Sequence, residues 1–229
     1  MRYAAVFVGA LGVIAETSEI QRLAFNAAFE KLGLTWKWEQ DRYLELLKVP
    51  GGRNRIARAA EQDGICDEID VGAAYRLKLG AYRSMLEVSG IQARPSVREF
   101  LAEAAALDLQ RGFVTSTPRE QVDALFAGLR GQITRAHFDY VGEREAVVAA
   151  KPAPDIYHHA LGELQLKPDE VLAVEDTPES AEAALAAGVS VIGFPGLAAQ
   201  GRAFPEGVPV VEFLSPRLLR RPTKAIAAA

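Results

Sequence analysis

The chain has 229 residues, of which 49% are hydrophobic and 24% are charged. This balance is typical of a globular fold and excludes a disordered, collagen-like or low-complexity chain. The net charge of −4 gives no electrostatic reason to expect nucleic-acid or membrane-surface binding, so a small molecule is the expected partner. A monomer is taken as the default state. Cys66 is the only cysteine, which excludes an intrachain disulfide and favours a reducing, cytoplasmic setting.

The first apolar stretch, residues 3–15, ends in Val13-Ile14-Ala15 and so has some features of a signal peptide. A single positive charge precedes it, and Gly9 and Gly12 interrupt it. We therefore expect a buried first strand over Tyr3–Val8. The stretch is too short to cross a bilayer, and no other window approaches the ~18 uncharged apolar residues that a span requires.

Short apolar runs alternate with helical patterns along the rest of the chain. Thr-Pro caps at Thr117 and Thr177 start two of the helices, and a Ser18-x-x-Gln21 capping box starts an earlier one. The pattern predicts an α/β fold, with a Rossmann-like core built on a parallel sheet. The further strands that we expect are Gly112–Thr115, His137–Val141, Val171–Val174 and Val189–Phe194.

Between the first two strands, residues 17–89 carry helical patterns and no convincing strand, with breaks at Pro50-Gly51-Gly52 and Gly64. We expect this segment to form a helical cap domain inserted into an α/β core made of residues 1–16 and 90–229. The tail contains Arg220-Arg221 and a terminal alanine run, and we expect it to be a frayed end.

Ligands bind parallel sheets beyond the carboxyl ends of the strands, so residues that follow the strands are candidate site residues. Thr115 and Ser116 end the second strand and offer hydroxyls to an anion. Lys151 begins a Lys-Pro-Ala-Pro-Asp-Ile string and carries an ammonium group. Glu175 and Asp176 follow the fourth strand as adjacent carboxylates, which suit a hard cation.

These three motifs resemble the second, third and fourth motifs of the haloacid dehalogenase (HAD) superfamily, and the helical insert resembles its small cap. The string from Ala15 to Gly52 is similar to the RuBisCO-operon (CbbY-type) branch of sugar-phosphate phosphatases, which is related to β-phosphoglucomutase. The resemblance extends from about Tyr3 to Gly196.

The resemblance implies that Thr115, Ser116 and Lys151 bind phosphate and that Glu175 and Asp176 bind Mg²⁺. The cap residues that it assigns to substrate contact are Glu16, Tyr43, Lys48, Arg53 and Arg55.

The first motif departs from the family. The family ends strand one with Asp-x-Asp, in which the first aspartate is the nucleophile and the second is the general acid and base. The resemblance aligns Gly9 and Leu11 with these positions, and neither side chain can attack phosphorus or exchange a proton. We therefore expect no carboxylate at the end of the first strand, and Mg²⁺ binding weakened by the missing ligand.

Three functions follow as alternatives. The first is a catalytically degenerate protein that binds a sugar phosphate or a protein partner. The second is an active Mg²⁺-dependent phosphatase or phosphomutase with a non-standard nucleophile, for which Glu16 is a candidate, although it lies at the cap hinge. The third is a structural role in which side chains such as Leu11 close the cleft.

Several site residues also have a second interpretation. We expect Lys151 to form an internal ion pair with Asp176, since an unpaired buried ammonium is costly. The Thr115 and Ser116 hydroxyls either hold a phosphate or satisfy helix amides. The basic residues Lys48, Arg53 and Arg55 either clamp a distal phosphate or form a solvated basic turn.

Overall fold

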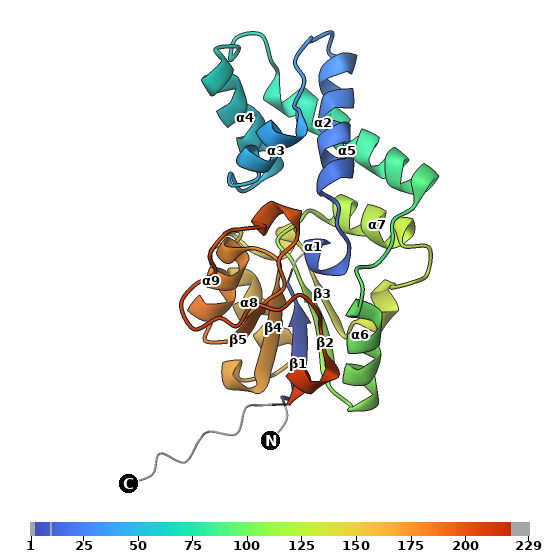
Figure 1. The fold of residues 1–229 in the computed structure, drawn as a ribbon, viewed down its shortest axis with the longest axis vertical. Helices are drawn as coiled ribbons and strands as arrows, with labels where there is room; N and C mark the ends of the chain where they lie inside the picture. The colour runs from blue at the N-terminus through green and yellow to red at the C-terminus, as the bar shows by residue number, and fades with distance from the viewer. Residues whose placement is uncertain (1–2, 10, 221–229) are drawn as a thin grey trace.

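The computed structural model describes residues 3–9 and 11–220, so Arg221 and the terminal alanine run lie outside the described residues. Five parallel strands form one sheet in the order β3-β2-β1-β4-β5, which confirms the predicted α/β class (Figure 1). The strands are β1 Ala5–Val8, β2 Gln110–Val114, β3 Tyr140–Gly142, β4 Val171–Glu175 and β5 Ser190–Gly193.

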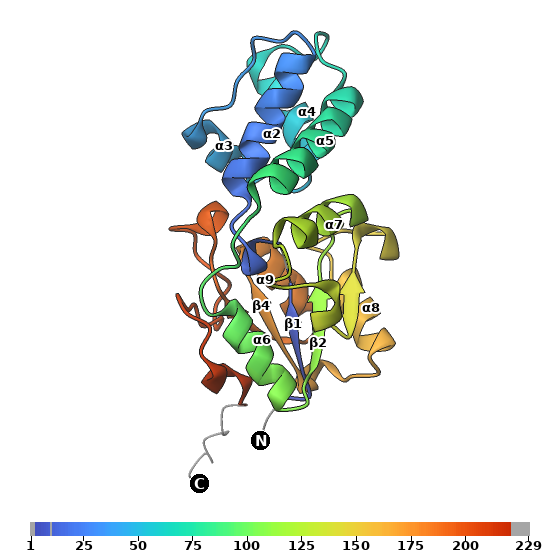
Figure 2. The same ribbon diagram turned by 90° about the vertical axis from the view of Figure 1, so that its right-hand side faces the viewer.

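Side chains on β1 alternate between the two faces of the sheet, as the pleat requires. Val6 and Val8 belong to one hydrophobic cluster, and Ala5 and Phe7 belong to another. Helices therefore cover both faces and give a three-layer core (Figure 2). The helices on the Val6 face are α1 Leu11–Ile14, α6 Val97–Ala106, α7 Arg119–Gly128 and η5 Pro216–Leu219; those on the other face are α8 Asp155–Glu163 and α9 Pro178–Ala186.

Four helices form a bundle beyond the carboxyl ends of the strands (Figures 1 and 2). Trp38 is 1% exposed at its centre and packs on the rings of Phe25 and Phe29, 4.8 and 4.9 Å away between centroids. The bundle thus has an apolar core of its own. Its helices are α2 Ser18–Lys31, α3 Gln40–Leu46, α4 Gly52–Asp63 and α5 Val71–Ser89.

Three local predictions are wrong by a few residues. The third strand begins at Tyr140, because His137 closes a 3-10 turn in which its ring accepts a hydrogen bond from the Thr134 amide. The helix after β2 begins at Arg119, one residue later than the Thr117 cap predicts, and the Thr117 hydroxyl bonds to Thr115 instead.

The capping box at Ser18 is wrong as well. Thr17 is the N-cap of α2, and no side chain caps this end of the helix. The Gln21 side chain donates to the Thr17 hydroxyl, and the Ser18 amide donates to Glu16 instead of to Gln21. The Thr177 cap is confirmed, since its hydroxyl accepts from the Ser180 amide at 3.3 Å.

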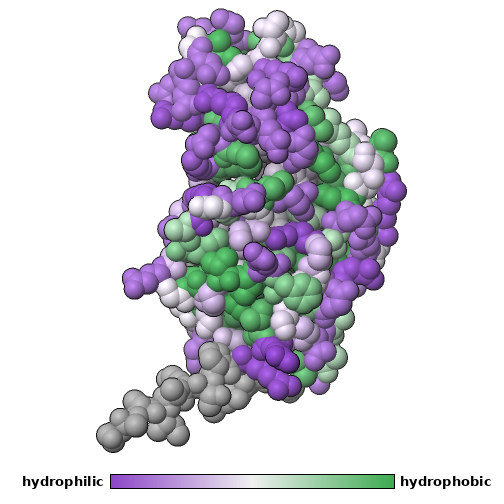
Figure 3. Space-filling model, in the orientation of Figure 1, coloured by the Kyte–Doolittle hydropathy of each residue, from purple (hydrophilic) through white to green (hydrophobic). Residues whose placement is uncertain are grey.

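The surface in Figure 3 is mostly hydrophilic over the bundle, and hydrophobic residues gather over the core. Among the exposed apolar side chains, Val210 and Phe213 belong to the segment after β5. No helix within the described parts of the chain has the length and apolar character of a membrane span.

Candidate functional site

The carboxyl ends of β1, β2 and β4 meet around the Lys151 ammonium. Its Nζ donates to the carbonyl oxygens of Gly9 at 2.6 Å and Val114 at 2.8 Å, and to Glu175 Oε1 at 2.5 Å. The ring of Tyr157 lies 4.8 Å from the same nitrogen. The charge of Lys151 is therefore neutralised inside the protein.

The predicted partner of Lys151 is wrong, because Glu175 and not Asp176 forms the ion pair. Glu175 is the last residue of β4, and Val174 lies beside Val8 in the sheet register. The Glu175 side chain consequently lies next to Gly9, which has no side chain to oppose it.

The Glu175 carboxylate fills the space that a side chain at position 9 would take. A Cβ atom on Gly9 would lie 2.0 Å from Oε1, 2.1 Å from Cδ and 2.4 Å from Oε2 of Glu175. The expectation that no carboxylate stands at the end of the first strand is therefore wrong, since β4 supplies one. It is fully buried, and its Oε1 accepts from Lys151 and from the Tyr157 hydroxyl.

Asp176 is also buried, next to Glu175. Burial and then the Glu175 carboxylate raise the pKa of Asp176 to about 7. Asp176 Oδ1 and Glu175 Oε2 have no hydrogen-bond partner among the described residues. A proton on Asp176 therefore removes the repulsion between two buried carboxylates, Glu175 and Asp176, that have the single Lys151 ammonium as counter-ion.

The raised pKa predicts how Asp176 affects stability. The folded state keeps the Asp176 proton up to about pH 7, whereas the unfolded chain releases it near the ordinary value of 3.8. This group therefore lowers stability as pH rises from 3.8 to about 7, and its cost is constant above that. We expect Asp176→Asn to raise the free energy of unfolding at pH 8 by on the order of 1–3 kcal/mol, and by less at pH 5.

Urea denaturation of both proteins at the two pH values measures this difference. Asp123→Asn is a matched control, because Asp123 is an exposed carboxylate that pairs with Arg135. An equal effect of Asp176→Asn at pH 5 and pH 8 would contradict the buried, proton-holding state.

The donor set does not fit the Mg²⁺ that the resemblance implies. Within residues 3–9 and 11–220, no three His, Cys, Asp or Glu side chains gather as a metal site. The Lys151 ammonium already binds two of the available oxygens, the Gly9 carbonyl and Glu175 Oε1. The Lys151 ammonium thus competes with a cation for these two oxygens.

The two hydroxyls after β2 differ in the hydrogen bonds that they form. Thr115 is 2% exposed, and its Oγ1 accepts from the Thr117 amide at 3.1 Å, so it satisfies backbone at the strand end. Ser116 Oγ accepts from the Lys151 amide at 3.4 Å, and its proton is not committed to an acceptor among the described hydrogen bonds. Ser116 is therefore the freer of the two hydroxyls.

Leu11 lies in α1 and is 6% exposed, within the hydrophobic cluster on the α6 and α7 side of the sheet. An apolar, buried side chain thus stands at the position that the resemblance aligns with the acid-base aspartate. Glu16 likewise is committed to backbone, because its Oε1 accepts from Ser18 and its Oε2 from Leu197 at 2.7 Å. These contacts fasten the hinge and leave Glu16 unsuited to attack phosphorus.

The bundle residues that the resemblance assigns to substrate contact do not gather into one phosphate-binding cluster. Arg55 is buried, and its guanidinium donates to the carbonyl oxygens of Leu46 and Val49, while Tyr43 packs beside it. Lys48 is exposed and pairs with Glu45. The basic residues near Gly51-Gly52 thus divide into one structural arginine, one surface ion pair and Arg53.

Arg53 is exposed and lies over the Tyr75 ring, 5.3 Å from its centroid. No ion pair in the described structure includes it. The Tyr75 hydroxyl accepts from Gln121 of α7 at 3.2 Å, which places this part of the bundle against the core. Arg53 is therefore a guanidinium close to the junction of the two parts.

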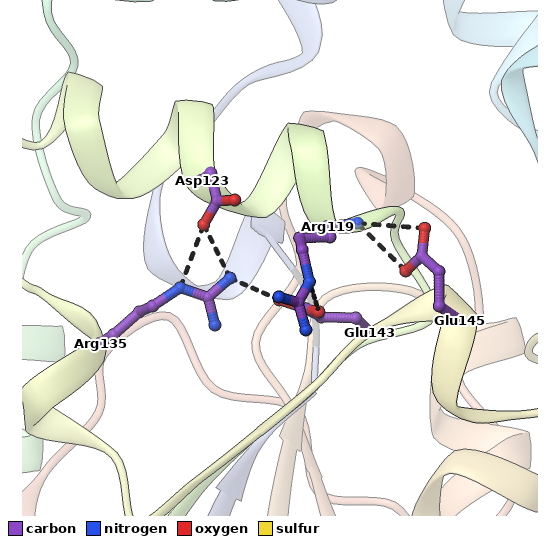
Figure 4. Close-up of polar contacts among 5 residues, drawn as sticks. All are labelled: Arg119, Asp123, Arg135, Glu143 and Glu145. Atoms are coloured by element: carbon purple, nitrogen blue, oxygen red, sulfur yellow. Dashed lines mark hydrogen bonds and ion pairs between the residues drawn. The ribbon is translucent and has the colours of Figure 1, made fainter.

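A charged network fixes the start of α7, and no sequence signal indicated it (Figure 4). The Arg119 amide donates to Glu145 at 3.2 Å, and the Arg119 guanidinium donates to Glu143 at 2.7 Å. Arg135 joins Glu143 to Asp123. The network joins α7 to the segment that follows β3.

The haloacid dehalogenase-like hydrolase family matches residues 3–188. The chain belongs to this family. Protein CbbY of Cereibacter sphaeroides is 35% identical over 186 residues, which are 81% of this chain and 81% of that protein, and this relative supports the CbbY-type branch.

Solved structures of the haloacid dehalogenase-like family share the fold. A crystal structure of a CbbY mutant from Rhodobacter sphaeroides in complex with xylulose-(1,5)bisphosphate is 30% identical, with a TM-score of 0.82 over 93% of this chain and 95% of that one. The β-phosphoglucomutase of Clostridium difficile is 17% identical, with a TM-score of 0.71 over 95% and 93%, and shows the fold alone.

Proposed function

We propose that this chain binds a phosphorylated sugar between its core and a cap domain of residues 17–89, and does not hydrolyse it. The observation that carries the proposal is the ion pair between Glu175 and Lys151, in which the carboxylate beside Gly9 is fully buried and serves as a counter-ion. Leu11 leaves the acid-base position apolar. Loss of general acid-base chemistry alone costs about 10²–10⁴-fold in rate.

The ligand class is inferred from the related CbbY structure, which holds xylulose-(1,5)bisphosphate. In this chain Arg53 supports the inference, because an exposed guanidinium without an ion-pair partner suits a phosphate dianion. The Ser116 hydroxyl is the corresponding donor from the core. A cytoplasmic setting belongs to the same proposal, since the sole cysteine, Cys66, is exposed and free.

Thermal unfolding tests binding. Xylulose-(1,5)bisphosphate at 100 times its Kd is expected to stabilise the protein by about 2.7 kcal/mol, whereas unphosphorylated xylulose has no effect. Arg53→Gln is expected to weaken binding. Arg58→Gln is the matched control, because Arg58 lies on the same helix and pairs with Glu61. If xylulose bisphosphate, ribulose bisphosphate and inorganic phosphate all fail to stabilise the protein, the proposed sugar-phosphate ligand is contradicted and a protein partner is favoured.

A phosphate-release assay tests the absence of turnover. With Mg²⁺ and a panel of sugar phosphates, the full chain is expected to release no phosphate above the blank, because uncatalysed monoester hydrolysis is extremely slow. Release that disappears in Glu175→Gln would contradict a binding-only function.

The position of Glu175 favours one further candidate, a phosphatase that uses this carboxylate as its nucleophile. In that reaction Glu175 would attack phosphorus, the ester P–O bond would break, and the alcohol would leave with a proton from water. Water would then hydrolyse the acyl phosphate. A phosphorylated Glu175 peptide in mass spectra would support this candidate; its absence together with no turnover would exclude it.

A further inference from the structure

One buried lysine joins the helical bundle to the core. Lys78 of α5 is 1% exposed, and its Nζ donates to Gln21 Oε1 of α2 at 2.9 Å and to Gln121 Oε1 of α7 at 3.0 Å. Gln121 lies in the core, so this single nitrogen spans the two parts. The bundle also packs on α7 through the buried side chains of Ala24, Tyr82, Leu86 and Ala124, and two chain segments, residues 15–17 and 90–96, connect it to the core.

The surroundings of Lys78 suit a neutral amine. A neutral amine has two N–H donors, which the two glutamine oxygens accept, whereas an ammonium has three. The Phe25 and Tyr82 rings lie 5.1 and 4.9 Å from Nζ and cover the rest of the group. No carboxylate of the described chain forms an ion pair with it.

The charged and titratable groups around Lys78 strengthen this conclusion. From α4, Arg55 repels an ammonium; from α5, Tyr82 offers only its ring and Tyr75 is reached through Gln121. From α2 and α7, the facing groups are uncharged amides. Burial and then Arg55 lower the pKa of Lys78 from 10.5 to about 7.

We propose that closing the helical bundle onto α7 expels a proton from Lys78, so that pH controls how firmly the bundle is closed. When the bundle moves away from α7, the amine meets water and regains an ordinary pKa. The closed arrangement binds fewer protons than the open one, so closure strengthens as pH rises from about 7 to 10.5. Below about 7 both arrangements carry the proton and the dependence ends. The proposal goes beyond the proposed function and stands without it.

The test uses the full chain and its single native thiol. Cys66 lies in the bundle and is exposed, and Glu182→Cys adds a second exposed thiol on α9 of the core. Nitroxide labels on both thiols report the distance between the two parts by pulsed electron paramagnetic resonance. The ratio of the short to the long distance population is expected to rise about tenfold per pH unit between pH 7 and 10.

Two variants of Lys78 separate charge from packing. Lys78→Met removes the proton and is expected to stay closed at every pH, whereas Lys78→Arg keeps its charge and is expected to stay open. Lys31→Met, a lysine change on the exposed surface of the bundle, is the control that should behave like the parent. Circular dichroism checks that each variant is folded.

A measurement on the unchanged protein covers the case in which a variant fails to fold. Reductive methylation of Lys78, followed by mass spectrometry and expressed relative to Lys48, is expected to fall as pH rises because closure hides the amine. A distance distribution that is constant from pH 6 to 10, or a pH response that survives in folded Lys78→Met, would overturn the proposal. A methylation ratio that does not fall would overturn it as well.

Discussion

Replacing Lys151 with methionine is expected to destabilise the fold by about 3–5 kcal/mol, because it leaves the buried Glu175 carboxylate without its counter-ion. Lys151 has 7% of its side chain exposed and Glu175 has none, so water cannot take over the role of the ammonium. The free energy of unfolding from urea denaturation at pH 7 measures the effect.

A double-mutant cycle separates this ion pair from packing. Glu175→Gln removes the charge that needs neutralising, so Lys151→Met combined with Glu175→Gln should cost less than the sum of the two single changes. Lys167→Met serves as control, since Lys167 is exposed on the core surface. Strictly additive effects would show that the two side chains do not interact in the folded protein.

Introducing an aspartate at position 9 is expected to make stability depend on Mg²⁺. Gly9→Asp places a Cβ 2.0 Å from Glu175 Oε1, so the buried Glu175 carboxylate has to move. The new aspartate is also a third carboxylate beside Glu175 and Asp176, with Lys151 as the neighbouring counter-ion. We expect a loss of about 2–4 kcal/mol without metal, through strain and unpaired charge. Three carboxylates form the oxygen set that Mg²⁺ accepts, so the metal should recover most of the loss.

Thermal unfolding with and without millimolar Mg²⁺ tests this prediction. Gly9→Asn has the same shape without the charge and should be destabilised in both conditions alike, while the parent protein should show no Mg²⁺ effect. Gly9→Asp combined with Leu11→Asp is expected to gain Mg²⁺-dependent phosphatase activity. A parent protein that Mg²⁺ stabilises as much as the variant would contradict our description of the donor set.

Some site residues could be found from the sequence and others could not. Lys151, Glu175 and Asp176 follow from their places after strands, because the carboxyl ends of parallel strands meet at one edge. Lys78 was not predicted from the sequence, although it lies on the same buried face of α5 as Ala74, Tyr82 and Leu86. A lysine within an apolar helical stripe is a signal that could have identified it.

The sequence alone determined the parallel α/β sheet, the run of helices between its first two strands, and the sheet edge at which Lys151, Glu175 and Asp176 gather, since hydrophobic periodicity and strand-end position are local properties of the chain. Only the tertiary structure decided that Lys151 pairs with Glu175, that this carboxylate fills the space at Gly9, and that the bundle meets the core through a buried amine. These outcomes depend on which side chain reaches an unoccupied space and which charge is cut off from water, and both are set by contacts between residues far apart in the chain.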